Sequence, residues 1–324
     1  MSPFFLPARL MAISMALMLI FSGTSAKAAS YNDGVAAYES GDYARALTIF
    51  DALAEEGHTA SLYSLGILYD RGLGVEEDDA QAVIYFLRAA LFGHAPAMSD
   101  IGVKYHDGEG VEQDYEQARD WFEMAAEQDY AAAQFNLGIY YENGIGTPQD
   151  LEQAVSWYRK AAEQGYVEAQ FNLATMYESG RGVARDPGQA AVWYRKSAEQ
   201  GYARAQFELA ALYSSGYGVS QDDEQALHWF RLAAEQGHAA AQFNLGILYY
   251  NGQGVEQNTD LAIVWYRRAA DQGYAGAQFN LGMMYYLAKG IEADRPEAIR
   301  LLKLSARQGY ELAQKTLTQI GEAW

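Results

Sequence analysis

The chain has 324 residues, of which 50% are hydrophobic, and its 42 Asp and Glu against 23 Lys and Arg give a net charge of −19. Such an acidic chain has no general attraction to nucleic acid or to an anionic membrane surface. It contains no cysteine, which excludes disulfides, cysteine-ligated zinc and a thiol nucleophile.

Residues 1–28 have the pattern of a secretory signal peptide. Arg9 precedes an apolar run, LMAISMALMLIF, and Ala26 and Ala28 show the A-x-A spacing of a cleavage site. We therefore expect cleavage near Ala28, a periplasmic or secreted mature protein and no membrane span in it. Retention of the segment as an anchor is the alternative, although the run is shorter than the roughly 20 residues that span a bilayer.

Residues 29–58 precede the repeats described next and include YESGDYARALTIFDALAEEG. The turn in this stretch is shorter than the turns that follow. We expect a tetratricopeptide-like helix pair that caps the N-terminal end.

Residues 59–310 repeat with a period of 36. The segment AAAQFNLGIYYENGIG (131–146) returns as AAAQFNLGILYYNGQG (239–254), three periods later. The period divides 59–310 into seven units, and self-similarity of this length is the signature of a stacked repeat protein. The residues in step are Ala97, Ala133, Ala169, Ala205, Ala241, Ala277 and Ala313; Tyr69, Tyr105, Tyr141, Tyr177, Tyr213, Tyr249 and Tyr285; Trp121, Trp157, Trp193, Trp229 and Trp265; and Gly74, Gly110, Gly146, Gly182, Gly218, Gly254 and Gly290.

Each unit predicts two helices. In the unit 131–166, apolar residues recur at helical spacing and Gly144 and Gly146 then end the first helix. Asp150 begins the second helix, and Gln153 three residues later resembles the partner in a capping box. Gly138 lies inside the first helix, where a small residue would let a neighbouring helix approach. Neither helix can bury its apolar face alone, so the units must stack. Residues 311–324 repeat only a first helix and predict a C-terminal cap.

The pattern A-x-x-x-L-G-x-x-Y-x-x-G-x-G-V-x-x-D-x-x-x-A-x-x-W-Y/F-x-x-A-A-x-x-G resembles the Sel-one-like repeat (SLR), a relative of the tetratricopeptide repeat. The resemblance covers 59–310. It implies an all-α fold, a right-handed α-solenoid of stacked helix pairs whose first helices line a concave groove. It also implies protein–protein interaction as the usual activity, in an exported bacterial protein. We expect no small-molecule cofactor.

Positions that vary between units on one side of the first helix are candidates for this groove. They face away from the recurrent scaffold residues when successive residues are placed 100° apart on a helical wheel. The alternative is that they are solvated positions free to vary. The candidate groove residues are Asn136, Ile139, Glu142, Asn143, Asn172, Thr175, Glu178, Glu208, Ala211, Asn244, Ile247, Tyr250, Asn280 and Met283.

The second unit, 95–130, departs most from the pattern. Ser99, Asp100, Lys104 and His106 form a candidate local polar binding spot there. Their crowding on one helix, with no evident oxyanion hole, argues against a catalytic triad. The G-x-G-V loops join helix to helix, so they do not fit a dinucleotide-binding fingerprint. The five histidines do not cluster as metal ligands, and we expect no catalytic residues and no metal site.

These observations predict a non-enzymatic interaction scaffold or regulatory binding protein of the bacterial cell envelope, with its partner in the concave groove. The partner could be a membrane sensor or a component of exopolysaccharide or motility machinery. A secreted or surface factor that binds a host protein is the first alternative. An envelope polysaccharide or peptidoglycan hydrolase is a weaker one, because it needs two carboxylates converging in a cleft.

Overall fold

The computed structural model describes residues 29–324, so the predicted signal peptide lies outside the described residues. The regular elements of the described part are seventeen α-helices, none of them both long enough and apolar enough to cross a membrane. The helices are α1 (Tyr31–Glu39), α2 (Tyr43–Glu55), α3 (Thr59–Asp70), α4 (Asp79–Leu91), α5 (Ala95–Asp107), α6 (Tyr115–Ala126), α7 (Ala131–Asn143), α8 (Leu151–Glu163), α9 (Val167–Ser179), α10 (Pro187–Glu199), α11 (Ala203–Ser215), α12 (Asp223–Glu235), α13 (Ala239–Asn251), α14 (Thr259–Asp271), α15 (Ala275–Leu287), α16 (Arg295–Arg307) and α17 (Glu311–Gln319).

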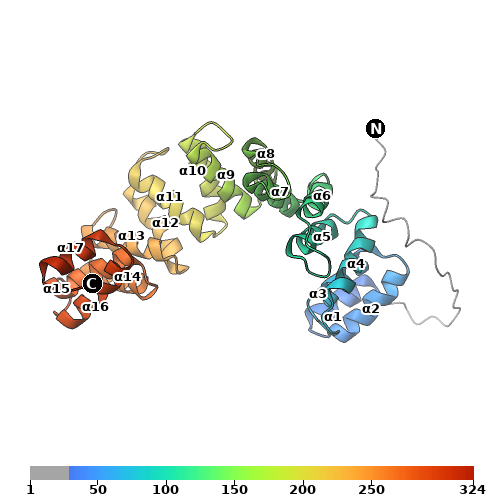
Figure 1. The fold of residues 1–324 in the computed structure, drawn as a ribbon, viewed down its shortest axis with the longest axis horizontal. Coiled ribbons are helices and arrows are strands. Elements are labelled where there is room, and N and C mark those ends of the chain that lie inside the picture. Colours follow the sequence, from blue (N-terminus) through green and yellow to red (C-terminus); the bar gives the residue numbers. More distant parts are fainter. Residues whose placement is uncertain (1–28) are drawn as a thin grey trace.

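The helices stack in chain order into an elongated, curved array with α1 and α2 at one end and α15 to α17 at the other (Figure 1). The main packing is between helices that are adjacent in sequence. We call α3, α5, α7, α9, α11, α13 and α15 the first helices, and the even-numbered α4 to α16 the second helices. The fold is therefore an all-α solenoid, in which each unit packs on its neighbours.

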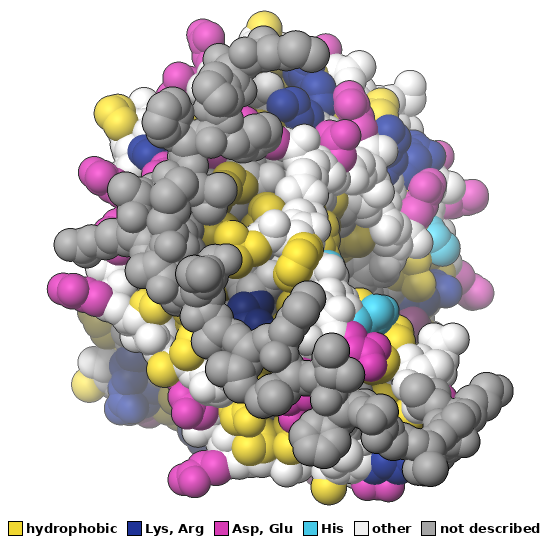
Figure 2. Space-filling view, turned by 90° about the vertical axis from the view of Figure 1, so that its right-hand side faces the viewer, with side chains coloured by type: hydrophobic (Ala, Val, Ile, Leu, Met, Phe, Trp, Pro, Cys, Tyr) yellow, Lys and Arg dark blue, Asp and Glu magenta, His cyan; other side chains and the backbone are white. Residues whose placement is uncertain are grey.

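The surface of the array is rich in carboxylates. Viewed toward its right-hand side in Figure 1, acidic side chains are spread around the outline, with hydrophobic side chains visible between them (Figure 2). The acidic side chains visible on this side are thus distributed rather than gathered into one patch.

The second helices begin at a capping side chain. The carboxylate of Asp150 accepts hydrogen bonds from the backbone N–H groups of Glu152 and Gln153, at 3.1 and 3.0 Å. Such a cap satisfies N–H groups that have no partner inside the helix. The expected capping box is only half present in this helix, because the Gln153 side chain does not bond back to the cap. A reciprocal box does occur at α1, between Ser30 and Asp33.

Two glycines with different roles shape the loop after the first helix in six of the seven units, and Ala288 replaces the first of them in the seventh. Gly144 ends α7 in the left-handed conformation, at φ 69°, as the sequence predicted. Gly146 has φ 59°, and a Cβ there would lie 2.6 Å from the backbone carbonyl carbon of Tyr115 in the preceding unit. The second glycine therefore permits the loop to pack directly on the start of the preceding second helix.

Small residues inside the first helices make room for aromatic rings. A Cβ on Gly246 would lie 2.6 Å from the ring of Tyr266, which belongs to the second helix of the same unit. Gly138 meets the ring of Tyr158 in the same way. The expected close approach is confirmed, and it is an approach of a buried tyrosine ring to the helix backbone.

Buried glutamines link neighbouring units, a feature not anticipated from the sequence. Gln134 is fully buried, donates to the carbonyl of Ala126 at 3.3 Å, and accepts from Gln164 at 2.8 Å. The same pairing recurs along the array, and we call the series the glutamine ladder. In each pair an exposed outer glutamine donates to a buried inner one: Gln164 to Gln134, Gln200 to Gln170, Gln236 to Gln206, Gln272 to Gln242, and Gln308 to Gln278. Each inner glutamine is thereby satisfied although it lies away from water.

Candidate binding groove

The candidate groove residues occupy repeated positions on the first helices. All of them are half-buried except Asn143, which is exposed. Half-burial is expected of a side chain that packs against a neighbouring helix and still presents atoms to solvent. The structure shows where these residues lie, and their role in binding stays a prediction.

Three hollows follow the same register along the first helices. The α1–α3 hollow has a volume of about 310 Å³, the α3–α5 hollow about 380 Å³ and the α13–α15 hollow about 150 Å³. Ile67, Val103 and Met283 line them and occupy equivalent positions of their units, as do Ser64, Asp100 and Asn280 in a second row. We call the surface of the first helices that carries these two rows the strip, and the three hollows are openings along it.

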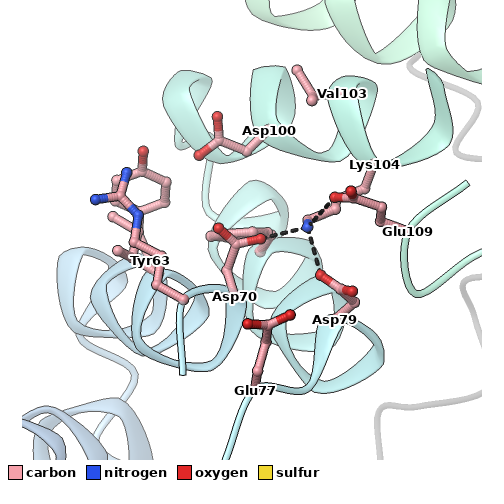
Figure 3. A pocket seen from close by; sticks show the side chains of 11 residues that line it. Tyr63, Asp70, Glu77, Asp79, Asp100, Val103, Lys104 and Glu109 are labelled. Atoms are coloured by element: carbon pink, nitrogen blue, oxygen red, sulfur yellow. Dashed lines mark hydrogen bonds and ion pairs between the residues drawn. The ribbon is translucent and has the colours of Figure 1, made fainter. Parts of the chain in front are cut away.

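A buried lysine organises the α3–α5 hollow (Figure 3). The Lys104 side chain ends 2.5 Å from Asp70, 2.6 Å from Asp79 and 2.7 Å from Glu109, while only 6% of the residue is exposed. Burial by itself would lower the pKa of Lys104, but the hydrogen bonds to three carboxylates outweigh it and raise that pKa above its usual value. The lysine therefore stays charged and holds the carboxylates of two units together.

Lys104 stands where the other units place an apolar or aromatic residue. The equivalents are Leu68, Tyr140, Met176, Leu212, Leu248 and Met284. A charge at a core position is retained only when it is paired and hydrogen-bonded. The three surrounding carboxylates therefore make a lysine tolerable at this core position.

Asp100 is a second special group in the α3–α5 hollow. Burial raises the pKa of its carboxyl group, and the nearby Asp70 raises it further, while a hydrogen bond donated by Tyr63 lowers it. The equivalent residue is asparagine in four other units, at Asn136, Asn172, Asn244 and Asn280. The second unit thus places a charge where most other units place a neutral amide.

The predicted polar spot is only partly assembled. Asp100 and Lys104 both line the α3–α5 hollow. Ser99 is buried in α5, and the Nδ1 atom of His106 lies 2.7 Å from the hydroxyl oxygen of Tyr140 in the next unit. Neither of these two side chains lines the hollow, so the four residues do not form one site.

The middle of the strip carries a row of glutamates. Glu142 accepts a hydrogen bond from Tyr158 at 2.6 Å and pairs with Arg181 at 3.0 Å, and Glu178 accepts from Tyr194 at 2.7 Å. Burial raises the pKa of Glu208, and the neighbouring Glu178 raises it further. The hydrogen bonds hold the carboxylates of Glu142 and Glu178, on α7 and α9, in place on the strip.

The α13–α15 hollow has a different character. Tyr250, Met283 and Leu287 line it together with Asn280 and Lys289. Leu287 is 48% exposed, so much of its side chain is open to solvent. This end of the strip offers aromatic and aliphatic surface, whereas the α3–α5 hollow offers carboxylates.

Within residues 29–324, no group of three or more His, Asp or Glu side chains is arranged so that it could hold a metal ion. Three of the histidines, His58, His94 and His238, cap first helices by accepting a backbone N–H. Their rings also contact aromatic neighbours, as His238 does with Phe207 at 4.7 Å between ring centres. These histidines therefore cap helices and pack against aromatic rings.

The sequence prediction missed most of the α3–α5 hollow. Tyr63, Asp70, Arg71, Asp79 and Glu109 were not among its candidates, although all line the hollow beside Asp100 and Lys104. One signal could have found them. Writing the units in register shows a lysine at an apolar core position, and such a residue requires acidic partners nearby.

Comparison with known proteins now places the chain. The Sel1 repeat pattern matches seven consecutive segments, which are 59–94, 95–130, 131–166, 167–202, 203–238, 239–274 and 275–310. The chain belongs to the Sel1 repeat family. Proteins of this family are generally protein-interaction scaffolds and typically non-enzymatic. No curated protein matches this Sel1 repeat protein in sequence.

Two solved structures are similar over most of the chain. One is c5321, described as a protective antigen of uropathogenic Escherichia coli strains with an SLR fold, with 40% identity and a TM-score of 0.85. The match covers 90% of this Sel1 repeat protein but only 63% of c5321. The other is a Sel1 repeat protein from Oxalobacter formigenes, with 33% identity, a TM-score of 0.64, and coverage of 74% of this chain and 96% of that one.

Proposed function

We propose that this protein is a non-enzymatic scaffold that holds a segment of a protein partner along its first helices. One observation carries the proposal: three hollows open in the same register along one strip, at positions where residues vary between otherwise similar units. A repeated scaffold with a varied strip is the arrangement by which solenoids present an extended binding surface.

The strip is large enough for specific binding. Three or four residues from each of seven units give roughly 25 residues, about one side of a standard protein–protein interface. Half-buried amides, carboxylates and tyrosines supply both hydrogen bonds and desolvated contact area, which suits an extended or helical peptide.

The proposed setting is the bacterial cell envelope. The signal-peptide pattern of residues 1–28 supports export. There the protein would act as a periplasmic regulatory partner of a membrane sensor or of exopolysaccharide or motility machinery. Its acidic surface favours a basic partner.

A secreted or surface protein that binds a host protein is the second candidate. It is favoured by the similarity to c5321, which is described as a protective antigen of a pathogen. Because this chain spans only 63% of c5321, the comparison suggests a setting and not a shared activity. Cell fractionation separates the two candidates, since the second requires the protein on the surface or in the medium.

The test is crosslinking of the tagged full chain in its native cell, followed by mass spectrometry. Ala211→Arg and Ile247→Arg place a long cation on the strip, at α11 and α13. Val192→Arg adds the same side chain to an exposed position of the second helix α10, where Val192 is 46% exposed. We expect one stoichiometric partner that both strip variants lose and the control keeps. Equal capture by all three variants would show that the strip is not the binding surface.

A further inference from the structure

The α3–α5 hollow and the α13–α15 hollow, which lie far apart on the strip, differ in charge. Five carboxylates line the α3–α5 hollow, those of Asp70, Glu77, Asp79, Asp100 and Glu109, against two cationic groups. The cations are Arg71 and Lys104, and the Lys104 ammonium is already shared among three of the carboxylates. The hollow thus retains negative charge that no residue lining it neutralises.

The shape of the α3–α5 hollow suits a long basic side chain. Its volume is about 380 Å³, and Tyr63, Ile67, Phe86 and Val103 provide apolar wall beside the carboxylates. Lysine and arginine bury their aliphatic stems against apolar surface while the charged head reaches a polar group. A guanidinium can also bind a carboxylate through two parallel hydrogen bonds, which adds geometric selectivity. Asp100, which accepts a hydrogen bond from Tyr63, and Glu77 are the carboxylates of the hollow that Lys104 does not contact.

The α13–α15 hollow would reject the same side chain. Its lining carries one charged group, the ammonium of Lys289, which repels a second cation. Tyr250, Met283 and Leu287 instead offer surface for an aliphatic or aromatic side chain. Repulsion at one end and attraction at the other specify direction as well as affinity.

The row between the two hollows continues the acidic character part of the way. Glu142 and Glu178 occupy the same position on α7 and α9, and that position holds Ser214 on α11 and Tyr250 and Tyr286 in the last two units. This position of the strip therefore changes from carboxylate on α9, through serine on α11, to tyrosine on α13.

We propose that the strip binds one segment of a partner protein in a single direction, with a Lys or Arg side chain in the α3–α5 hollow and an aliphatic or aromatic side chain in the α13–α15 hollow. This inference rests on the proposed function and names its ligand chemistry. Five units separate the hollows. If the first helices of neighbouring units lie about 10 Å apart, the five steps cover about 50 Å. At about 3.3 Å per extended residue, roughly 15 residues of extended chain span this distance.

The test uses random peptides of about 20 residues, displayed on phage and selected on the immobilised full chain; this length covers the span estimated above. Selected peptides are then synthesised with a fluorophore and their affinity is measured by polarisation. We expect a basic residue toward one end and an aliphatic or aromatic residue toward the other. Asp100→Asn should weaken binding about tenfold, the loss expected for one charge-assisted contact. Asparagine at the equivalent position of four other units makes this variant structurally mild.

Matched changes separate the two hollows. Leu287→Asp should weaken the same peptides, and replacing the peptide's basic residue by leucine should abolish the difference between the wild type and the Asp100→Asn variant. Val192→Asp, on the second helix α10, should change nothing. If a peptide with a basic residue bound the wild type and the Asp100→Asn variant with equal affinity, the inference would be overturned.

The outcomes also separate this inference from the proposed function. Suppose that the selected peptides fail to bind the Ala211→Arg variant and yet lack a basic residue, or bind the Asp100→Asn variant as well as the wild type. Either outcome overturns the two-ended groove and leaves the scaffold function standing. Peptides that bind the Ala211→Arg variant unchanged, or a selection that yields no binder, contradict both.

Discussion

The ammonium of Lys104 donates a hydrogen bond to the carboxylate of Asp79 at 2.6 Å, across the junction of two repeat units. Lys104 belongs to α5 of the second unit, and Asp79 is the first residue of α4 in the unit before it. Other units fill the position of Lys104 with residues such as Leu68 and Leu212. A polar contact has thus replaced an apolar one at this junction, and it can be tested separately from the rest of the array.

Lys104→Leu should lower stability although leucine fits the position in other units. The substitution leaves Asp70, Asp79 and Glu109 facing one another without their cation, at a cost of about 2 kcal/mol, less than for fully buried carboxylates because these are partly exposed. Urea unfolding followed by circular dichroism measures the change. Adding Asp79→Asn to Lys104→Leu should recover part of the loss, and equal stability of wild type and Lys104→Leu would contradict the account.

The stability difference between the wild type and the Lys104→Leu variant should depend on pH in the alkaline range. The folded-state pKa of Lys104 lies above its usual value of 10.5, so its contribution is fully present below pH 10.5 and is lost as pH rises through the folded-state pKa. The difference in unfolding free energy between wild type and Lys104→Leu should therefore be constant near neutrality and shrink above pH 10.5. Comparing the two chains at each pH removes the common effect of the tyrosines.

Asp100→Asn should raise the stability of the fold at neutral pH. Burial and the nearby Asp70 raise the folded-state pKa of Asp100 above its usual value of 3.8, so the charged form is disfavoured in the folded protein. The group is therefore least costly below pH 3.8, and its unfavourable contribution develops as pH rises through the raised pKa. Thermal melts of both chains from pH 3 to pH 7 should converge at the acid end. A stability gain combined with weaker peptide binding would mark Asp100 as a residue kept for function.

Gly146→Ala should be more damaging than Gly144→Ala. Both positions have positive φ, which costs a non-glycine residue about 1 kcal/mol, and Ala288 already adopts such a conformation at the equivalent of Gly144, with φ 51°. At Gly146 the added Cβ also meets the backbone of Tyr115 in the preceding unit, so the total cost should reach about 3 kcal/mol. Chemical denaturation of the two variants measures the difference, and similar losses would show that the loop can shift away.

Gln206→Leu should destabilise the array by about 2 kcal/mol, because the buried carbonyl of Ala198 loses its donor. Gln236→Ala removes only the exposed outer member of the same pair and should cost less than about 1 kcal/mol. Hydrogen exchange at the α10–α11 junction, where Ala198 and Gln206 lie, should rise locally in the first variant. The reverse order of effects would mean that the ladder acts through its exposed end.

The seven matched units and the all-α solenoid could be read from the sequence because the scaffold residues recur at a strict period. Ala133, Leu137, Tyr141 and Gly146 each carry out one local task, and their spacing along the chain is enough to reveal it. Two features escaped this kind of inference. The inner glutamines were repeated but polar, so periodicity alone did not distinguish a buried Gln134 from a solvated one. The α3–α5 hollow depends on residues that do not repeat.

Sequence by itself determined the period, the helix pairs and the turns, since these depend on residues within one unit and on local backbone preferences. Only the tertiary structure decided that Asp70, Asp79 and Glu109 meet Lys104, and that Tyr63 and Asp100 share a hollow with them. These groups come from two units, and the stacking of one unit on the next sets the distances between them. Coulomb and hydrogen-bond energies depend on those distances, so the chemistry of the strip follows from packing between units and not from the pattern within any one of them.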